Sequence, residues 1–119
     1  MATLVIADDS LIMRKTLKIL IEKLGHQVIG EATDGRDACE KYGLLKPDGV
    51  IMDIEMPNMN GIEAIKRINS EGKNARILVI SNHNEKDLIM EALKNGAKYY
   101  ILKPISQDSL KKGLDILFS

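Results

Sequence analysis

Two adjacent carboxylates end an apolar run near the N-terminus, in the stretch VIADDS at residues 5–10. Asp8 and Asp9 therefore lie where a small domain builds its core. Two like charges about 4 Å apart repel by roughly 4 kcal/mol at an effective dielectric constant of about 20. Either open water or a bound cation must offset this repulsion. A third carboxylate, Asp53, follows another apolar run, and three carboxylates at one place would suit Mg²⁺, a hard cation that prefers oxygen ligands and usually works with phosphate.

A hydroxyl and an ammonium group also follow apolar runs, namely Ser81 and Lys103. A hydroxyl donor and a cation beside a carboxylate–metal site suit a phosphoryl group, whose oxygens need donors and positive charge. Taken singly, each candidate has an ordinary interpretation: Asp8 as a helix cap, Ser81 as a loop cap, and Asp53 and Lys103 as solvated strand ends. Their joint placement is what favours a functional site.

Five short apolar runs rich in β-branched residues predict the strands that position these groups. Three of the runs are nearly continuous rather than alternating, which is typical of strands covered on both faces. The predicted strands cover residues 3–7, 27–32, 49–54, 76–81 and 98–103.

Five segments with helical spacing alternate with these strands. Ser10 is the expected N-cap of the first helix and Gly25 its end, Asp34 caps the second, which runs to Lys46, and either Ser106 or Asp108 opens the fifth. The residues expected on the apolar faces are Leu11, Ile12, Leu17, Ile19, Leu20 and Leu24 in the first helix, Ile62, Ile65 and Ile68 in the third, Leu88, Ile89, Ala92 and Leu93 in the fourth, and Leu110, Leu114 and Leu117 in the fifth.

This alternation predicts an α/β fold, a doubly wound five-stranded parallel sheet with five helices and the flavodoxin-like strand order 2-1-3-4-5. Chain direction reverses between strands 1 and 3, and ligands bind outside the carboxyl ends of the strands at that point. The topology thus brings Asp8, Asp9 and Asp53 to one crevice, with Ser81 and Lys103 on the same rim.

Composition sets the broad class of protein. With 119 residues, we expect one domain over 1–119 and no second domain. Seventeen acidic and seventeen basic side chains give a formal net charge of zero, which argues against nucleic-acid or membrane-surface binding by bulk electrostatics. No apolar run has the length of a membrane span and no signal-peptide pattern is present, so a cytoplasmic protein is expected. Cys39 is the only cysteine, and His26 and His83 lack zinc-ligand spacing.

Four stretches together resemble the receiver domain of two-component response regulators, particularly the single-domain chemotaxis type. They are ADDS, MDIEMPNMNG, ISN and LKP, at residues 7–10, 52–61, 80–82 and 102–104, and the resemblance covers essentially the whole chain. The joint pattern is specific, whereas each piece alone would be weak.

The resemblance implies a role for each candidate residue. It implies that Asp53 accepts a phosphoryl group, that Lys103 pairs with the phosphoryl oxygens, that Ser81 hydrogen-bonds one of them and that Tyr100 is the switch aromatic. For Mg²⁺ it implies direct ligands from Asp9, Asp53 and the backbone carbonyl of Glu55, with Asp8 acting through water. It also implies a cis peptide bond between Lys103 and Pro104.

Some positions depart from the family pattern or have a simpler interpretation. Asn82 replaces a small residue and Ile105 an aromatic one, which puts transfer and hydrolysis rates and the recognition surface in question. Glu55 and His83 flank the site, and we predict that they influence the lifetime of the phosphorylated state. We interpret Met52, Met56 and Met59 as core or loop packing, and Cys39 as a small semi-buried side chain of a helix. We interpret Arg14, Lys15 and Lys18 as a solvated helix face, although the equivalent face docks kinases in the family.

The leading hypothesis is a phosphorylation-controlled signalling switch rather than a stand-alone enzyme. It would take phosphate from the phosphohistidine of a sensor histidine kinase or phosphotransfer protein and catalyse its own dephosphorylation. It would present the surface of the fourth helix, fifth strand and fifth helix to an output protein, with chemotaxis as a candidate pathway.

One alternative is a Mg²⁺-dependent aspartyl-phosphate phosphatase, for which Asp53 and Glu55 are a candidate carboxylate pair, but the chain has no room for a substrate-covering cap. A phosphorylation-independent docking module would predict a missing acceptor or lysine, and both are present.

Overall fold

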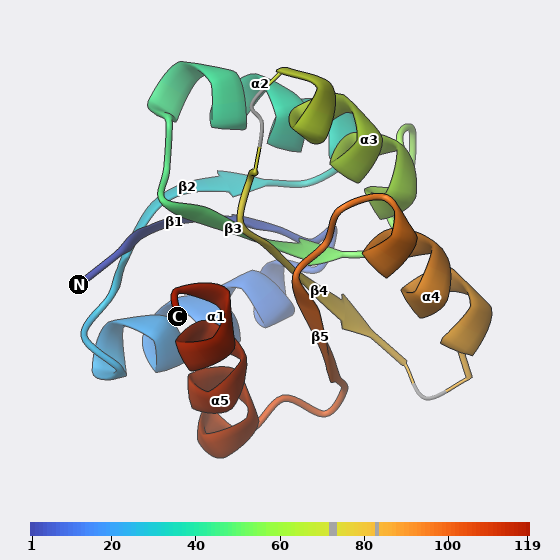
Figure 1. The fold of residues 1–119 in the computed structure, drawn as a ribbon. Helices are drawn as coiled ribbons and strands as arrows, with labels where there is room; N and C mark the ends of the chain where they lie inside the picture. The colour runs from blue at the N-terminus through green and yellow to red at the C-terminus, as the bar shows by residue number, and fades with distance from the viewer. Residues whose placement is uncertain (72–73, 83) are drawn as a thin grey trace.

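A five-stranded parallel sheet forms the centre of the protein in a computed structural model that describes residues 1–71, 74–82 and 84–119 (Figure 1). The strands pair in the order β2-β1-β3-β4-β5, which confirms the predicted fold class. Their bounds are β1 Thr3–Ala7, β2 Gln27–Ala32, β3 Gly49–Asp53, β4 Ile77–Ser81 and β5 Tyr99–Leu102. Two strands, β3 and β5, end one residue earlier than predicted, so Ile54 and Lys103 lie just beyond them. Strands β4 and β5 each begin one residue later than predicted, at Ile77 and Tyr99.

Five helices cover the two faces of the sheet. They are α1 Leu11–Lys23, α2 Gly35–Leu45, α3 Gly61–Glu71, α4 Lys86–Lys94 and α5 Gln107–Leu117. Helices α1 and α5 lie on one face, and α2, α3 and α4 lie on the other (Figure 1). Within the part of the chain that the structure describes, no helix is both long enough and apolar enough to cross a bilayer.

The interior positions of the central strands are apolar because each of their two faces packs against helices. In β4, Ile77 and Val79 belong to the apolar cluster under α2, α3 and α4, whereas Leu78 and Ile80 belong to the cluster under α1 and α5. Successive side chains of a strand point to opposite faces. A strand buried on both sides therefore needs no polar residues until it reaches the rim of the sheet.

The helix ends follow the predicted capping chemistry. Ser10 accepts a hydrogen bond from the backbone N–H of Met13, and Asp34 accepts one from Asp37. Ser106, not Asp108, is the N-cap of α5. Gly25 follows α1 with φ of +89°, a left-handed conformation that glycine adopts without the steric penalty of a side chain.

Several packing predictions are confirmed. Met52 and Met56 are buried, and Met59 packs against the same apolar cluster. Cys39 is buried in α2 with its Sγ 3.7 Å from the carbonyl oxygen of Ala64. The Lys103–Pro104 peptide bond is cis.

The predicted faces of α1 are partly wrong. Leu11, Ile12 and Ile19 are exposed, whereas the buried positions are Leu17 and Ile21. The helix is rotated so that residues 14, 17 and 21, spaced by three and four, face the sheet and its neighbours. Arg14 consequently belongs to the inner side of α1 rather than to a solvated face with Lys15 and Lys18, which are exposed as predicted.

Candidate functional site

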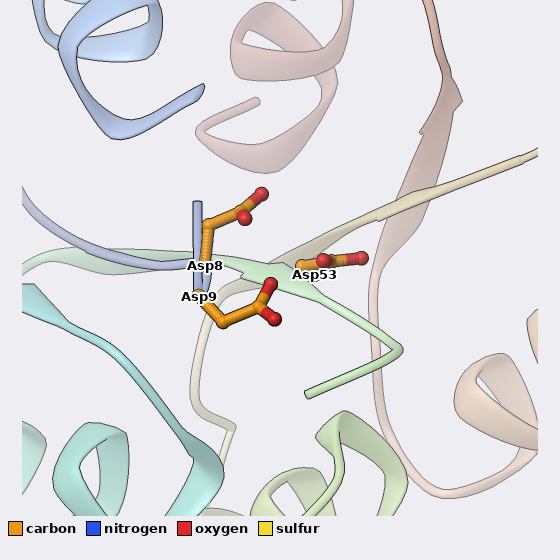
Figure 2. A group of neighbouring side chains, drawn as sticks. All are labelled: Asp8, Asp9 and Asp53. Carbon is orange, nitrogen blue, oxygen red and sulfur yellow. The ribbon is translucent and has the colours of Figure 1, made fainter. Parts of the chain in front are cut away.

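Three carboxylates meet at the carboxyl ends of β1 and β3. Each of Asp8, Asp9 and Asp53 has a carboxylate oxygen within 4.8 Å of the others. Figure 2 shows Asp8 and Asp9 extending from the end of β1 toward the side on which Asp53 lies. Because β1 and β3 are parallel neighbours with Ala7 opposite Met52, the residues that follow these two positions must emerge side by side. The predicted convergence is confirmed.

Asp8 is held in place by the backbone around it. Its N–H donates to the carbonyl of Ala32 at 3.0 Å, and its Oδ1 accepts from the N–H of Ser10 at 2.9 Å. The second oxygen, Oδ2, is buried and has no hydrogen-bond partner among the described residues. Burial raises the pKa of the Asp8 carboxyl, and the Ser10 N–H and the charge of Lys103 offset this only partly.

Asp53 has the most perturbed carboxyl group of the site. Its side chain is almost fully buried, and burial together with the charge of Asp8 raises the pKa of Asp53 to about 7. The Lys103 ammonium lies 3.6 Å from Asp53 Oδ2 and lowers that pKa. The site offers three carboxylates as oxygen ligands, one of them with a buried oxygen that receives no hydrogen bond from the described residues. These features and the raised carboxyl pKa values of Asp8 and Asp53 fit a divalent cation that prefers oxygen ligands.

The loop after β3 brings its backbone close to the acceptor candidate. Gly61, the first residue of α3, donates its N–H to the carbonyl of Ile54 at 2.8 Å. A Cβ at this position would lie 2.7 Å from the carbonyl oxygen of Asp53, so the glycine that ends MDIEMPNMNG lets α3 begin directly behind Asp53. Glu55 is exposed, and its N–H lies 3.4 Å from Asp53 Oδ1. An open hollow of about 450 Å³ reaches this region, lined in part by Asp9, Glu55 and Leu88.

The other rim of the site is formed by the ends of β4 and β5. The N–H of Lys103 donates to the carbonyl of Ser81 at 2.8 Å, which fixes the two strand ends together. The Ser81 hydroxyl is buried and donates to Glu85 Oε1 at 2.8 Å. Tyr100 on β5 is half-buried, packs against the apolar cluster of the α2–α3–α4 face and has its ring centroid 5.4 Å from that of Tyr99.

Residues 4–115 match the family model of the response regulator receiver domain. The chain belongs to this family. It is 49% identical over 110 residues to the chemotaxis protein CheY of Thermotoga maritima, with 92% of each chain covered. It is 40% identical over 116 residues to the transcriptional regulatory protein YdfI of Bacillus subtilis, which covers 97% of this chain and 54% of that longer protein. A chain of the crystal structure of the CheX–CheY–BeF3–Mg²⁺ complex from Borrelia burgdorferi matches with a TM-score of 0.92 at 33% identity, covering 98% of this chain and 89% of that chain.

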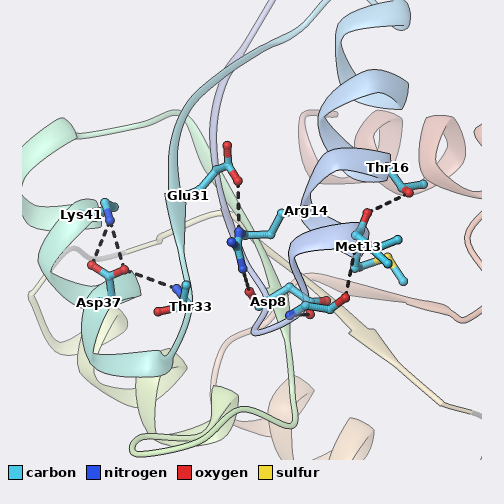
Figure 3. A network of polar contacts seen from close by, with 10 residues as sticks. Asp8, Met13, Arg14, Thr16, Glu31, Thr33, Asp37 and Lys41 are labelled. Atoms are coloured by element: carbon cyan, nitrogen blue, oxygen red, sulfur yellow. Dashed lines mark hydrogen bonds and ion pairs between the residues drawn. The ribbon is translucent and has the colours of Figure 1, made fainter.

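One residue that supports the acidic cluster of this receiver domain, Arg14, was predicted to lie on a solvated helix face but is directed inward. Arg14 donates from its terminal nitrogen to the carbonyl of Asp8 at 2.7 Å and from Nε to Glu31 at 3.0 Å (Figure 3). Only 12% of its side chain is exposed. The signal was available, because Arg14 has helical spacing with the buried residues Leu17 and Ile21 and therefore lies on the same side of α1.

A second supporting residue, which was not predicted from the sequence, is Glu85, buried immediately before α4. It lies four positions before Ile89 and seven before Ala92, both buried, so its spacing also places it on the inner side of the helix. Of the positions that depart from the receiver-domain pattern, Asn82 is exposed and Ile105 is partly buried. His83, the other residue predicted to influence the phosphorylated state, lies outside the described residues.

Proposed function

We propose that this receiver domain is a phosphorylation-controlled signalling switch in which Asp53 accepts a phosphoryl group from the phosphohistidine of a histidine kinase or phosphotransfer protein. The observation that carries the proposal is the position of Asp53 between two other carboxylates and an ammonium group. Asp8 and Asp9 each approach it within 4.8 Å, and Lys103 lies 3.6 Å away. Family membership supports the same reading.

The proposed step is a phosphoryl transfer with balanced bonds. An oxygen of the ionised Asp53 carboxylate attacks phosphorus, and the new P–O bond forms as the P–N bond to the donor imidazole breaks. The electron pair of that bond stays on the leaving nitrogen, which takes a proton from solvent. A carboxylate is a weak nucleophile, so positioning and charge neutralisation supply most of the rate enhancement. Lys103 pairs with the phosphoryl oxygens as negative charge develops on them.

The acidic cluster is the proposed site of Mg²⁺. Asp9, Asp53 and the backbone carbonyl of Glu55 are the proposed direct ligands, and Asp8 acts through an intervening water. When bound, Mg²⁺ neutralises the clustered carboxylates and the charge on the phosphoryl oxygens. Nearby positive charge favours the ionised form of a carboxylate, which is the form of Asp53 that attacks.

Phosphorylation is expected to act through the opposite rim. It adds about −1.5 to −2 charges to Asp53 at neutral pH, and the Ser81 hydroxyl is the donor that moves to this new anion. Tyr100 responds to that movement, and the surface of α4, β5 and α5 changes for an output protein. The similarity to CheY of Thermotoga maritima over most of both chains supports chemotaxis as the pathway, and the domain itself catalyses loss of the phosphoryl group.

No observation among the described residues favours the phosphatase alternative. That reaction needs a second carboxyl group placed to exchange protons at Asp53. Glu55 approaches Asp53 with its backbone N–H, and its side chain is exposed. The described geometry therefore supplies no reason to prefer an enzyme with a separate substrate.

Phosphorylation with a small donor tests the proposal. The protein is incubated with Mg²⁺ and acetyl phosphate, and its intact mass is measured. We expect one added phosphoryl group on the unaltered protein, none on Asp53→Asn, and unchanged labelling of Asp108→Asn, which removes an exposed carboxylate at the start of α5. An unlabelled unaltered protein, or equal labelling of Asp53→Asn, would contradict the mechanism.

The same assay addresses the residues that flank the site. After the donor is removed, the mass spectrum reports how fast the phosphoryl group is lost. We expect Glu55→Ala and His83→Ala to change this rate, because in the sequence each position lies two residues after a proposed site residue, Asp53 and Ser81 respectively. An unchanged rate in both variants would discard that role.

A further inference from the structure

The Ser81 hydroxyl is already engaged by a charged partner. Ser81 is fully buried at the end of β4, and its Oγ donates to Glu85 Oε1 at 2.8 Å. Glu85 Oε1 also accepts a hydrogen bond from the backbone N–H of Asn82 at 2.7 Å. Both are short bonds to a carboxylate, and such charge-assisted hydrogen bonds are roughly twice as strong as neutral ones.

Glu85 depends on these two donors. The residue is only 7% exposed, and its second oxygen, Oε2, is buried with no hydrogen-bond partner among the described residues. A buried carboxylate is costly unless it is hydrogen-bonded. Loss of either donor to Oε1 is therefore more costly here than it would be at a solvated carboxylate.

The acceptor is also fixed relative to the rest of the domain. The carbonyl of Glu85 accepts the N–H of Ile89 at 2.9 Å, which joins it to the first turn of α4, and the N–H of Glu85 donates to the carbonyl of Asn82 at 3.2 Å. Ile89 is itself buried against the sheet. The Glu85 carboxylate is thus an anchored partner of the Ser81 hydroxyl.

A serine hydroxyl has one hydrogen to donate. It cannot be donated fully to Glu85 and to a phosphoryl oxygen on Asp53 at the same time. We propose that Glu85 is a positioning residue that holds the Ser81 hydroxyl in the unphosphorylated conformation and competes with the phosphoryl group for its proton. The inference rests on the proposed function and adds a restraint that sets how readily the domain becomes active.

The competition is measurable as binding of a phosphoryl mimic. The probe is beryllium fluoride with Mg²⁺, the pair present in the related Borrelia burgdorferi complex, and its dissociation constant is measured by isothermal titration calorimetry. Glu85→Met removes the acceptor while keeping a long side chain in the buried position. We expect it to bind the mimic roughly tenfold more tightly than the unaltered protein, about the worth of one hydrogen bond to a charged group.

Glu85→Gln separates the hydrogen bond from the charge. The amide oxygen still accepts from Ser81 and Asn82, but the negative charge is gone, so we expect a dissociation constant closer to that of the unaltered protein than to that of Glu85→Met. Equal tightening in both variants would show that the charge of Glu85 repels the anion, and would overturn the proposal. Asp87→Asn, which removes an exposed carboxylate in the first turn of α4, is the matched control and should leave the affinity unchanged.

A double-mutant cycle assigns the effect to the Ser81 proton. In a Ser81→Ala background, Glu85→Met should lose most of its effect on the dissociation constant, whereas an undiminished effect would overturn the proposal. Thermal unfolding establishes that each variant is folded, and Glu85→Ala carries the same expectation if Glu85→Met does not fold. If the unaltered protein does not bind the mimic, the proposed function is contradicted. If the unaltered protein and Glu85→Met bind the mimic with equal affinity, only the role of Glu85 is contradicted.

Discussion

Helices α1 and α4 each begin at the carboxyl edge of the sheet with a charged residue on the inner side, but the two residues support the site in different ways. Arg14 contacts the backbone carbonyl of Asp8 and the carboxylate of Glu31 through two different nitrogens, at 2.7 and 3.0 Å. Glu85 receives two donors at a single oxygen, one of them the Ser81 hydroxyl.

This difference separates a fixed support from an exchangeable one. A guanidinium group has several donors in rigid geometry, so Arg14 can hold the end of β1 without losing its contact to β2. Glu85 shares one oxygen between a backbone N–H and a hydroxyl that can rotate. Asp53 lies between these regions, so the cation and the switch can be tested separately by changing one side at a time.

The largest expected effect concerns the charge of Asp53, which lies between the two regions. The pKa of Asp53 is about 7 in the folded, metal-free protein, compared with 3.8 for the ordinary group. The folded state therefore binds the proton more tightly, and the free energy of unfolding falls as the pH rises from about 4 through 7. Asp53→Asn removes this penalty, so without divalent cations it should be more stable than the unaltered protein at pH 8, by up to about 4 kcal/mol.

Urea unfolding in the presence of a chelator, at pH 4 and pH 8, measures this difference. The advantage of Asp53→Asn should shrink toward pH 4, where the carboxyl group of the unaltered protein is protonated in the folded state. A smaller slope of the same sign should remain in the variant, because the pKa of Asp8 is also raised. If the free energy of unfolding depends on pH identically in the two proteins, the raised pKa of Asp53 is contradicted.

Removal of the fixed support should have the next largest effect. Arg14→Ala leaves the Asp8 carbonyl and the Glu31 carboxylate without their shared donor, and we expect the free energy of unfolding to fall by about 2 kcal/mol. Lys15→Ala, at the exposed neighbouring position, should change it by less than about 0.5 kcal/mol. Urea denaturation at neutral pH compares the two variants. Equal effects would mean that the contacts of Arg14 stabilise the fold no more than a solvated side chain does, as the sequence suggested.

The stabilisation by Mg²⁺ should depend on the acidic cluster and not on Ser81. A cation bound only to the folded state stabilises it by about 1.4 kcal/mol at ten times its dissociation constant. We expect Asp9→Asn to lose most of this increment and Ser81→Ala to retain it. Melting curves with and without Mg²⁺ give the comparison, and an increment that survives in Asp9→Asn would place the ion elsewhere.

The smallest expected effect is on the β4 side. Ser81→Ala removes one of the two donors to Glu85 Oε1 and should lower the free energy of unfolding by about 1 kcal/mol, with or without Mg²⁺. Ser70→Ala, which removes an exposed hydroxyl on α3, should produce no such loss. Chemical denaturation decides, and an unchanged stability of Ser81→Ala would mean that its bond to Glu85 contributes nothing in the unphosphorylated protein.

Much of the fold could be predicted because local chemistry and global topology agree. Continuous apolar runs indicated strands covered on both faces, and Ser10 and Asp34 marked helix beginnings by an interaction that spans three residues. For the fifth helix the sequence offered Ser106 or Asp108, and the structure selects Ser106. The strand alternation then predicted the order of the sheet. Parallel strands place their carboxyl ends on one edge, so the convergence of Asp8, Asp9 and Asp53 also followed from the sequence.

Sequence patterns were therefore enough to predict the helices and strands, the strand order and the acidic cluster. Helical spacing could have indicated that Arg14 and Glu85 face inward, but which partner each of them contacts depends on how the whole helix docks against the sheet. Leu11 and Ile12 became exposed while Arg14 turned inward, and Glu85 became the partner of Ser81. Such pairings join surfaces that meet only when the helices dock, so no spacing within one segment specifies them.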